Sequence, residues 1–237
     1  MPIADRHAIF KHGVKEVAAL QGKAVTFMAK WASDLAGSSC HIHASLWDLR
    51  SEGREPLGWD EKGPGHMSKK LQHWVAGQLA LGPALALFYA PYVNSYRRYQ
   101  AGTFAPTRLV AGVDNRTCGL RLLGHSPPAI RVENRCPGAD ANPYLAFAAT
   151  IAAGLHGIEH KLPLPPEFHG DAYTAADLPR VPSNLTSAVA ALERSQVARE
   201  ALGDEVVEHY LHAARLELKT FDGVVTDWEL RRNFERI

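Results

Sequence analysis

Apolar residues recur at helical spacing in three segments before the C-terminal region. The first segment, residues 3–20, carries these apolar positions before Gly22: Ile3, Phe10, Val14, Val17 and Leu20. It predicts an amphipathic helix that opens the chain. Residues 68–82 begin with a serine that can cap a helix, and Pro83 is expected to interrupt or restart that helix. Residues 142–162 are almost entirely apolar, which predicts a buried helix.

Shorter apolar runs predict strands at 24–30, 40–47, 108–113, 118–123 and 129–135. The stretch 48–67 is rich in Gly, Pro and charge, and it predicts a long loop. After a Pro-rich connector at 177–182, further helices are expected at 183–195, 203–221 and 227–237. The pattern indicates an α+β fold with an antiparallel or mixed sheet.

Apolar and polar residues alternate along the predicted strand at 40–47, CHIHASLW. Its apolar face holds Cys40, Ile42, Ala44 and Leu46. Its polar face holds His41, His43 and Ser45. A half-exposed strand whose polar face meets water would explain this pattern, and so would a site that needs two imidazoles.

A second alternating strand lies in AIRVENRCPG, where Arg131, Glu133 and Arg135 share one face. A surface ladder of salt bridges and an anion site with a metal-ligating carboxylate both fit it. Between residues 97 and 135 the chain has no lysine but seven arginines, which are Arg97, Arg98, Arg108, Arg116, Arg121, Arg131 and Arg135. Arginine grips carboxylates and phosphates in a planar, bidentate way, so this concentration favours binding of those groups.

Composition narrows the class of protein. The 237 residues carry a formal net charge of +1, so no general attraction to nucleic acid or to an anionic membrane is expected. The three cysteines are expected to be reduced, buried thiols. Without a signal-peptide core or an apolar run long enough to span a bilayer, a cytoplasmic location is expected.

Six motifs, in order, resemble the catalytic domain of the glutamine synthetase superfamily. They are TFMAK (26–30), GSSCHIHASLW (37–47), NSYRRYQAGTFAP (94–106), DNRTCGLR (114–121), RVENR (131–135) and ADANPYLAFAA (139–149). The resemblance implies that the whole chain, 1–237, is a partial catalytic domain of this type, with 183–237 as its helical C-terminal segment. A zinc hydrolase of the (β/α)₈ type would need more ligands and a repeat that this chain lacks.

The resemblance also implies roles for individual residues. His41 and Glu133 match ligands of divalent ions, and His43 and Ser45 match nucleotide-contacting positions. Gly37, Arg98 and Arg135 match positions at the bound glutamate. The arginines that match those steadying the transferring phosphate and ADP are Arg116, Arg121 and Arg131.

The implied reaction uses ATP and Mg²⁺ or Mn²⁺. ATP phosphorylates the γ-carboxylate of glutamate, and an amine then displaces the phosphate. The implied partners are therefore small molecules, namely glutamate, an amine and ATP. The full-length form is expected to be a homo-oligomer.

Two positions depart from ammonia-using glutamine synthetases. Phe104 occupies the place of a glutamate that helps to bind ammonium, and Ala36 replaces an asparagine that helps to hold glutamate. An aromatic side chain cannot accept a proton, but it can pack against a larger amine. The motifs look more like the branch that joins glutamate to polyamines, ethanolamine or aromatic amines. Leu162 stands where some bacterial members carry an adenylylated tyrosine.

Length is the largest departure, because family members run to roughly 440 residues or more. The small N-terminal β-grasp domain and the glutamate-bearing strands after it have no counterpart here. The chain alone is therefore expected to have little or no ligase activity. The alternative is a non-catalytic relative that serves as a structural or assembly protein.

Overall fold

A four-stranded mixed sheet lies at the centre of the protein. The computed structural model describes residues 1–50 and 55–236. The sheet order is β1 (Ile42–Ala44), β6 (Arg131–Asn134), β5 (Cys118–Leu123) and β4 (Arg108–Val113). Strand β6 pairs antiparallel with both β1 and β5, whereas β4 pairs parallel with β5. The predicted α+β class with a mixed sheet is confirmed.

Two long helices, α2 (Lys69–Tyr89) and α3 (Pro143–Glu159), pack against this sheet. Their shared core with the strands includes Trp74, Leu120 and Val132. The two helices approach closely because glycines face each other, and a Cβ on Gly77 would lie 2.8 Å from the Cα of Gly157. This packing holds the strands that carry the polar faces seen in the sequence.

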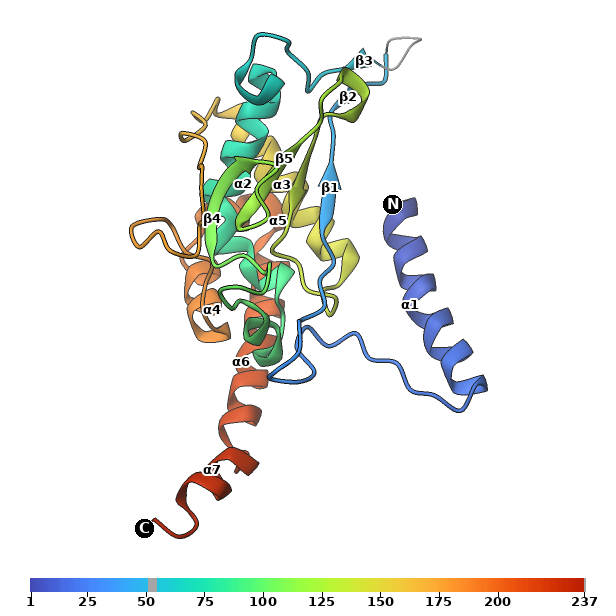
Figure 1. Ribbon diagram of the computed structural model, residues 1–237, viewed down its shortest axis with the longest axis vertical. Coiled ribbons are helices and arrows are strands. Elements are labelled where there is room, and N and C mark those ends of the chain that lie inside the picture. Colours follow the sequence, from blue (N-terminus) through green and yellow to red (C-terminus); the bar gives the residue numbers. More distant parts are fainter. Residues whose placement is uncertain (51–54, 237) are drawn as a thin grey trace.

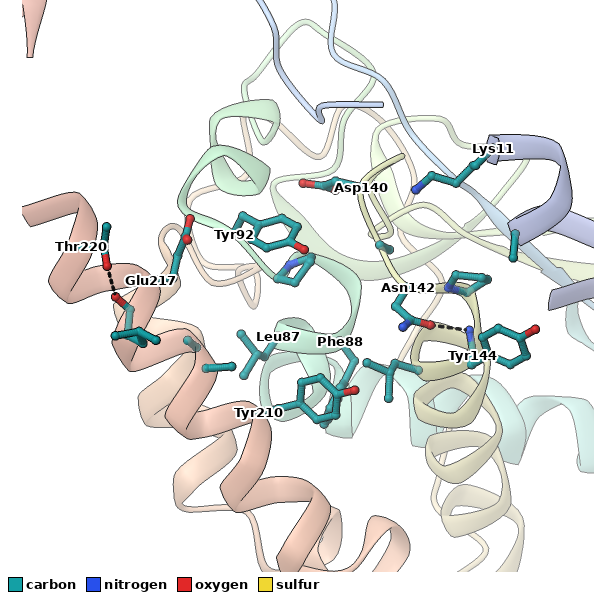
Figure 2. A pocket seen from close by; sticks show the side chains of 18 residues that line it. Lys11, Leu87, Phe88, Tyr92, Asp140, Asn142, Tyr144, Tyr210, Glu217 and Thr220 are labelled. Atoms are coloured by element: carbon teal, nitrogen blue, oxygen red, sulfur yellow. Dashed lines mark hydrogen bonds between the residues drawn. The ribbon is translucent and has the colours of Figure 1, made fainter. Parts of the chain in front are cut away.

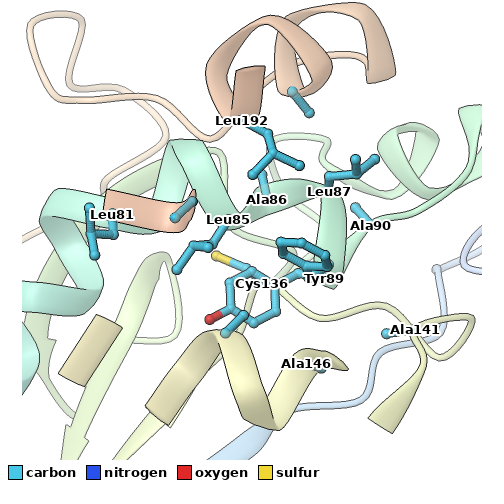
Figure 3. Close-up of a cluster of buried hydrophobic side chains, with 14 of the residues drawn as sticks. Leu81, Leu85, Ala86, Leu87, Tyr89, Ala90, Cys136, Ala141, Ala146 and Leu192 are labelled. Carbon is cyan, nitrogen blue, oxygen red and sulfur yellow. The ribbon is translucent and has the colours of Figure 1, made fainter. Parts of the chain in front are cut away.

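The C-terminal helices build a second core on α2. They are α4 (Leu185–Glu193), α5 (Gln196–Leu202) and α6 (Asp204–Asp222). Leu85, Tyr89 and Leu192 lie in this cluster together with Cys136, which follows β6 (Figure 3). Strand β6 therefore contributes Val132 to the first core, and the residue Cys136 that follows it belongs to the second.

The two terminal helices lie at the outside of this body: α1 stands beside it and α7 projects from it (Figure 1). Helix α1 (Pro2–Leu20) forms as predicted, but most of the apolar residues that predicted it are exposed, with Leu20 at 85%. Helix α7 (Asp227–Asn233) lies beyond the end of α6, and its Trp228 is also exposed. The periodicity of α1 predicted a helix correctly, but in the described part of the chain that face has little to pack against.

Three secondary-structure predictions were wrong in detail. Residues 24–30 are irregular rather than a strand, because the amide and the carbonyl of Lys30 bond to the side chain of Asn94. Pro83 does not end α2, which continues to Tyr89 because its last turns are buried. Helix α5 was not predicted as a separate element.

The remaining elements are short. The predicted loop at 48–67 contains strand β3 (Glu55–Pro56) and the 3₁₀ turn η1 (Pro64–His66), and strand β2 (Trp47–Asp48) lies across its start. Two more 3₁₀ turns are η2 (Val93–Arg98) and η3 (Pro127–Ala129). Residues 51–54 of that loop and Ile237 of the last predicted helix lie outside the described residues.

The cysteines and the helices bear on two further expectations. All three cysteines are free; Cys118 and Cys136 are buried, whereas Cys40 is only partly so. None of the helices in the described ranges has both the length and the apolar character that a bilayer span requires.

Candidate active site

Strands β1 and β6 bring the histidine pair onto the acidic residue of RVENR. In their antiparallel register His43 lies opposite Glu133. His41, immediately before β1, places its Nδ1 2.8 Å from Oε1 of Glu133. Two motifs that are 92 positions apart in the sequence therefore meet at one carboxylate.

Glu133 is the centre of a charged cluster. Its side chain is 5% exposed, and Arg135 donates from Nη1 to Oε1 at 2.8 Å while Arg121 donates from Nη1 to Oε2 at 3.2 Å. Burial alone would raise the pKa of this carboxyl group, but the hydrogen bond from His41 and the charge of Arg135, with Arg121, lower it to about 2. Glu133 is therefore an anion at neutral pH.

Arg121 is shared between two carboxylates. Its Nε donates to Oδ1 of Asp114 at 2.9 Å, and its Nη2 also bonds to that oxygen. The Arg121 guanidinium in turn lowers the pKa of Asp114. Asp114 was not predicted as a site residue, although it opens the DNRTCGLR motif.

His43 and Arg131 form a second contact across the same strands. Nε of Arg131 donates to Nδ1 of His43 at 3.3 Å, and Nη1 donates to the carbonyl of Ala129 at 2.9 Å. Partial desolvation lowers the pKa of His43, which is still exposed by surface area. The charge of Glu133 raises this pKa, and Arg131, His41 and Arg121 lower it. These effects favour a neutral imidazole that accepts from Arg131.

Arg98 lies behind the cluster and is 3% exposed. Its Nη2 donates to the backbone carbonyls of Arg135 and Cys136, and its guanidinium lies 5.0 Å from the ring centroid of Tyr99. A Cβ on Gly37 would lie 2.6 Å from Cγ of Arg98, so only glycine fits there without a shift. Gly37 and Arg98 are thus in contact, and Arg98 supports the backbone of Arg135.

Phe104 approaches the cluster through its backbone. Its carbonyl accepts from Nη2 of Arg135 at 2.9 Å, and its side chain is 61% exposed. The φ angle of Phe104 is +56°, a left-handed conformation that is uncommon for a bulky residue. The loop is therefore held in an unfavourable backbone conformation beside the cluster.

Four other residues singled out from the sequence are not joined to this cluster by a direct contact. Arg116 is exposed in the turn after β4, and Ser45 accepts a hydrogen bond from the Trp47 indole at 2.8 Å. Arg108 is buried at the start of β4, and Arg97 lines a separate pocket with residues of α6. The seven arginines of residues 97–135 are therefore not one patch.

The cluster supplies few ligands for a metal ion. Across residues 1–50 and 55–236, no group of three or more His, Cys, Asp or Glu side chains is placed to hold a metal. His41 and Glu133 are only two side chains, and Mg²⁺ or Mn²⁺ takes more oxygen ligands than that. The metal cage is incomplete within the described chain.

A separate cavity of about 630 Å³ lies between α1, α2, α3 and α6 (Figure 2). Its walls include Phe88, Tyr92 and Tyr210, with Lys11 and Asp140 at its upper rim in the view. No residue of the Glu133 cluster described above is among its lining. The cavity is therefore not part of the candidate active site.

The amino-acid sequence is similar to those of several known proteins. The chain is 52% identical over 233 residues to the γ-glutamylethanolamide synthetase GlnA4 of Streptomyces coelicolor. It is 42% identical to type-1 glutamine synthetase 2 of Dictyostelium discoideum and 38% identical to a glutamate–isopropylamine ligase of a Pseudomonas species. Two of these names support the predicted resemblance to the amine-ligase branch.

A solved structure described as a GmaS/ADP complex superimposes with a TM-score of 0.87 at 33% identity, covering 98% of this chain and 54% of that one. The alignments cover 98–99% of this chain but 48%, 45% and 51% of the three relatives, so the chain spans about half the length of the curated relatives it matches. The family model for the glutamine synthetase catalytic domain matches residues 1–233. The chain therefore belongs to the glutamine synthetase catalytic-domain family.

Proposed function

We propose that this chain carries part of the active site of an ATP-dependent ligase that joins the γ-carboxyl group of glutamate to an amine. The observation that carries the proposal is the cluster in which His41, Arg121 and Arg135 converge on Glu133, with Arg131 and His43 beside it. A cationic wall of this kind stabilises the negative charge that develops on a transferring phosphoryl group.

The proposed reaction has two steps. The γ-phosphoryl group of ATP moves to the γ-carboxylate of glutamate, giving ADP and an acyl phosphate. The amine nitrogen then attacks the acyl carbon, phosphate leaves, and the nitrogen loses a proton. Arg116, Arg121 and Arg131 are proposed to steady the phosphates, with His43 and Ser45 at the nucleotide and Gly37, Arg98 and Arg135 at glutamate.

A divalent ion is a finer part of the proposal. His41 and Glu133 are proposed as two ligands of a Mg²⁺ or Mn²⁺ ion. ATP oxygens, water and groups outside the described residues would complete its coordination. Because this chain supplies only two ligands, no chemical step is derived through the ion.

The amine is proposed to be larger than ammonia. Phe104 offers neither charge nor a proton acceptor, but its exposed ring can pack against carbon. The names of the Streptomyces and Pseudomonas relatives, which refer to ethanolamide and isopropylamine, support this choice. The active form is proposed to be a cytoplasmic homo-oligomer that uses small-molecule substrates, without nucleic acid or membrane as a partner.

A hybrid enzyme tests the proposal. This chain would replace the matching 233 residues of the Streptomyces coelicolor relative, and phosphate release would be measured with glutamate, ATP and a series of amines. The chain alone is the second sample. We expect turnover by the hybrid, faster with ethanolamine than with ammonia, and little or none by the chain alone.

A folded hybrid that releases no phosphate with any amine would contradict the ligase. It would favour the alternative, a non-catalytic structural or assembly protein of the family. A chain that forms oligomers and ignores ATP would support that alternative as well.

A further inference from the structure

An irregular segment, residues 163–182, runs along the open edge of β4. We call this segment the strap. The amide of Phe168 donates to the carbonyl of Ala111 at 2.9 Å. Further along the strap, the amide of Leu109 donates to the carbonyl of Pro179 at 2.8 Å. The strap thus supplies hydrogen-bond partners for part of the edge strand β4, although the strap itself does not form a regular strand.

The strap also holds the turn that carries Arg116. The Asn115 side-chain amide donates to the carbonyl of Gly170 at 2.9 Å, and the amide of Ala172 donates to Oγ1 of Thr117 at 2.9 Å. Inside the turn, the Thr117 hydroxyl donates to Oδ1 of Asn115 at 2.7 Å. Both residues that flank Arg116 are therefore fixed by strap backbone.

One strap side chain reaches the loop that carries Phe104. The Tyr173 hydroxyl donates to the carbonyl of Ala105 at 3.1 Å, while Arg135 donates to the preceding carbonyl, that of Phe104, at 2.9 Å. Ala105 and the following Pro106 are buried. Two successive carbonyls thus accept hydrogen bonds from different parts of the protein. The carbonyl of Phe104 accepts from Arg135 in the charged cluster, and that of Ala105 accepts from Tyr173 in the strap.

This double hold explains how Phe104 keeps its left-handed backbone. A bulky residue stays in such a conformation only where surrounding contacts fix it. Burial raises the pKa of Tyr173 above its ordinary value, so its hydroxyl is a donor at neutral pH. Without this donor, the Arg135 contact would be the one remaining bond to these two carbonyls among the described residues.

We propose that the strap is a positioning element for the loops of Phe104 and Arg116, and that Tyr173 is a positioning residue that selects the amine by fixing the backbone that carries the Phe104 ring. The selection of the amine rests on the proposed ligase function. The positioning of the loop rests on the hydrogen bonds alone. The two parts can therefore be tested separately.

Hydrogen–deuterium exchange of this chain tests the positioning. Tyr173→Phe removes the hydroxyl and keeps the ring, so we expect exchange in residues 99–107 to become about fivefold faster. Tyr144→Phe is the matched control, because it removes a hydroxyl that bonds to Asp5 of α1. Unchanged exchange in 99–107, or equal acceleration throughout the chain, would overturn the positioning role.

Kinetics of the hybrid enzyme test the selection. We expect Tyr173→Phe to raise KM for ethanolamine about fivefold, with kcat and the KM for ATP changed less than about twofold. A uniform loss of kcat, with the KM for ethanolamine unchanged, would overturn the selection of the amine. An inactive hybrid would overturn the proposed function, and hydrogen exchange would still decide whether Tyr173 positions the loop.

Discussion

Glu133 is expected to make the protein's stability depend on pH in a specific way. The carboxylate is buried, accepts from His41, Arg121 and Arg135, and has a pKa of about 2 against an ordinary value of 4.5. A group whose pKa is lowered in the folded state stabilises it above the unfolded pKa. That stabilisation is lost as the pH falls through the folded pKa. The relevant window therefore runs from about pH 5 down to about pH 2.

The magnitude follows from the same shift. Each pKa unit corresponds to about 1.4 kcal/mol, which gives roughly 3 kcal/mol for the full shift. The neighbouring His43 is exposed, so solvent screens part of this cluster, and about 1–2 kcal/mol is the better expectation. Glu133→Gln keeps the shape of the side chain and removes the charge. It should cost this amount at pH 7.

Urea unfolding at pH 7, 4.5 and 3 measures the effect. The difference in unfolding free energy between the native chain and Glu133→Gln should shrink steadily as the pH falls. Glu61→Gln, at an exposed loop position, is the control and should change little at any pH. A Glu133→Gln difference that is the same at every pH, or is zero at pH 7, would show that the Glu133 charge does not stabilise the fold.

Two further predictions concern packing and substrate choice. Gly77→Ala would drive a Cβ into the α3 backbone near Gly157, so it should lower the unfolding free energy by about 1–3 kcal/mol in thermal melts. Gly13→Ala has open space in α1 and should stabilise the chain slightly, and equal effects of the two changes would contradict the close helix packing. Phe104→Glu in the hybrid should raise the ratio of kcat/KM for ammonia to that for ethanolamine by about tenfold or more. Phe104→Leu should not raise it, and a similar rise in both variants would show that the charge is irrelevant.

Local patterns predicted the parts of the fold that pack on themselves. Helices at 68–82 and 142–162 and strands at 108–113, 118–123 and 129–135 were expected from apolar spacing. The corresponding elements form because their apolar faces meet in shared cores. Residues 24–30 have the composition of a strand without a strand partner in the described chain. Whether a segment pairs with another strand depends on residues far away in the sequence, and a local pattern of apolar residues carries no information about them.

The residues that belong to the site were easier to predict from the sequence than the way in which they are arranged. Alternation placed His41 and His43 on one face and Glu133 on another strand, but it could not show that the two strands are neighbours in register. The family resemblance implied only that His41 and Glu133 both act on divalent ions. Tyr173 had no signal in the sequence, because its hydroxyl acts on the backbone carbonyl of Ala105, and a backbone carbonyl is present at every position.

Calorimetric titration of the purified chain with ATP in the presence of Mg²⁺ tests most directly the claim that this cluster receives a nucleotide. Wild type would be compared with a double variant, Arg121→Ala with Arg131→Ala, and with Arg97→Ala, whose arginine lies away from the cluster. We expect saturable binding that the double variant loses and Arg97→Ala retains. Equal binding by wild type and the folded double variant, or no binding by a folded wild-type chain, would contradict that claim.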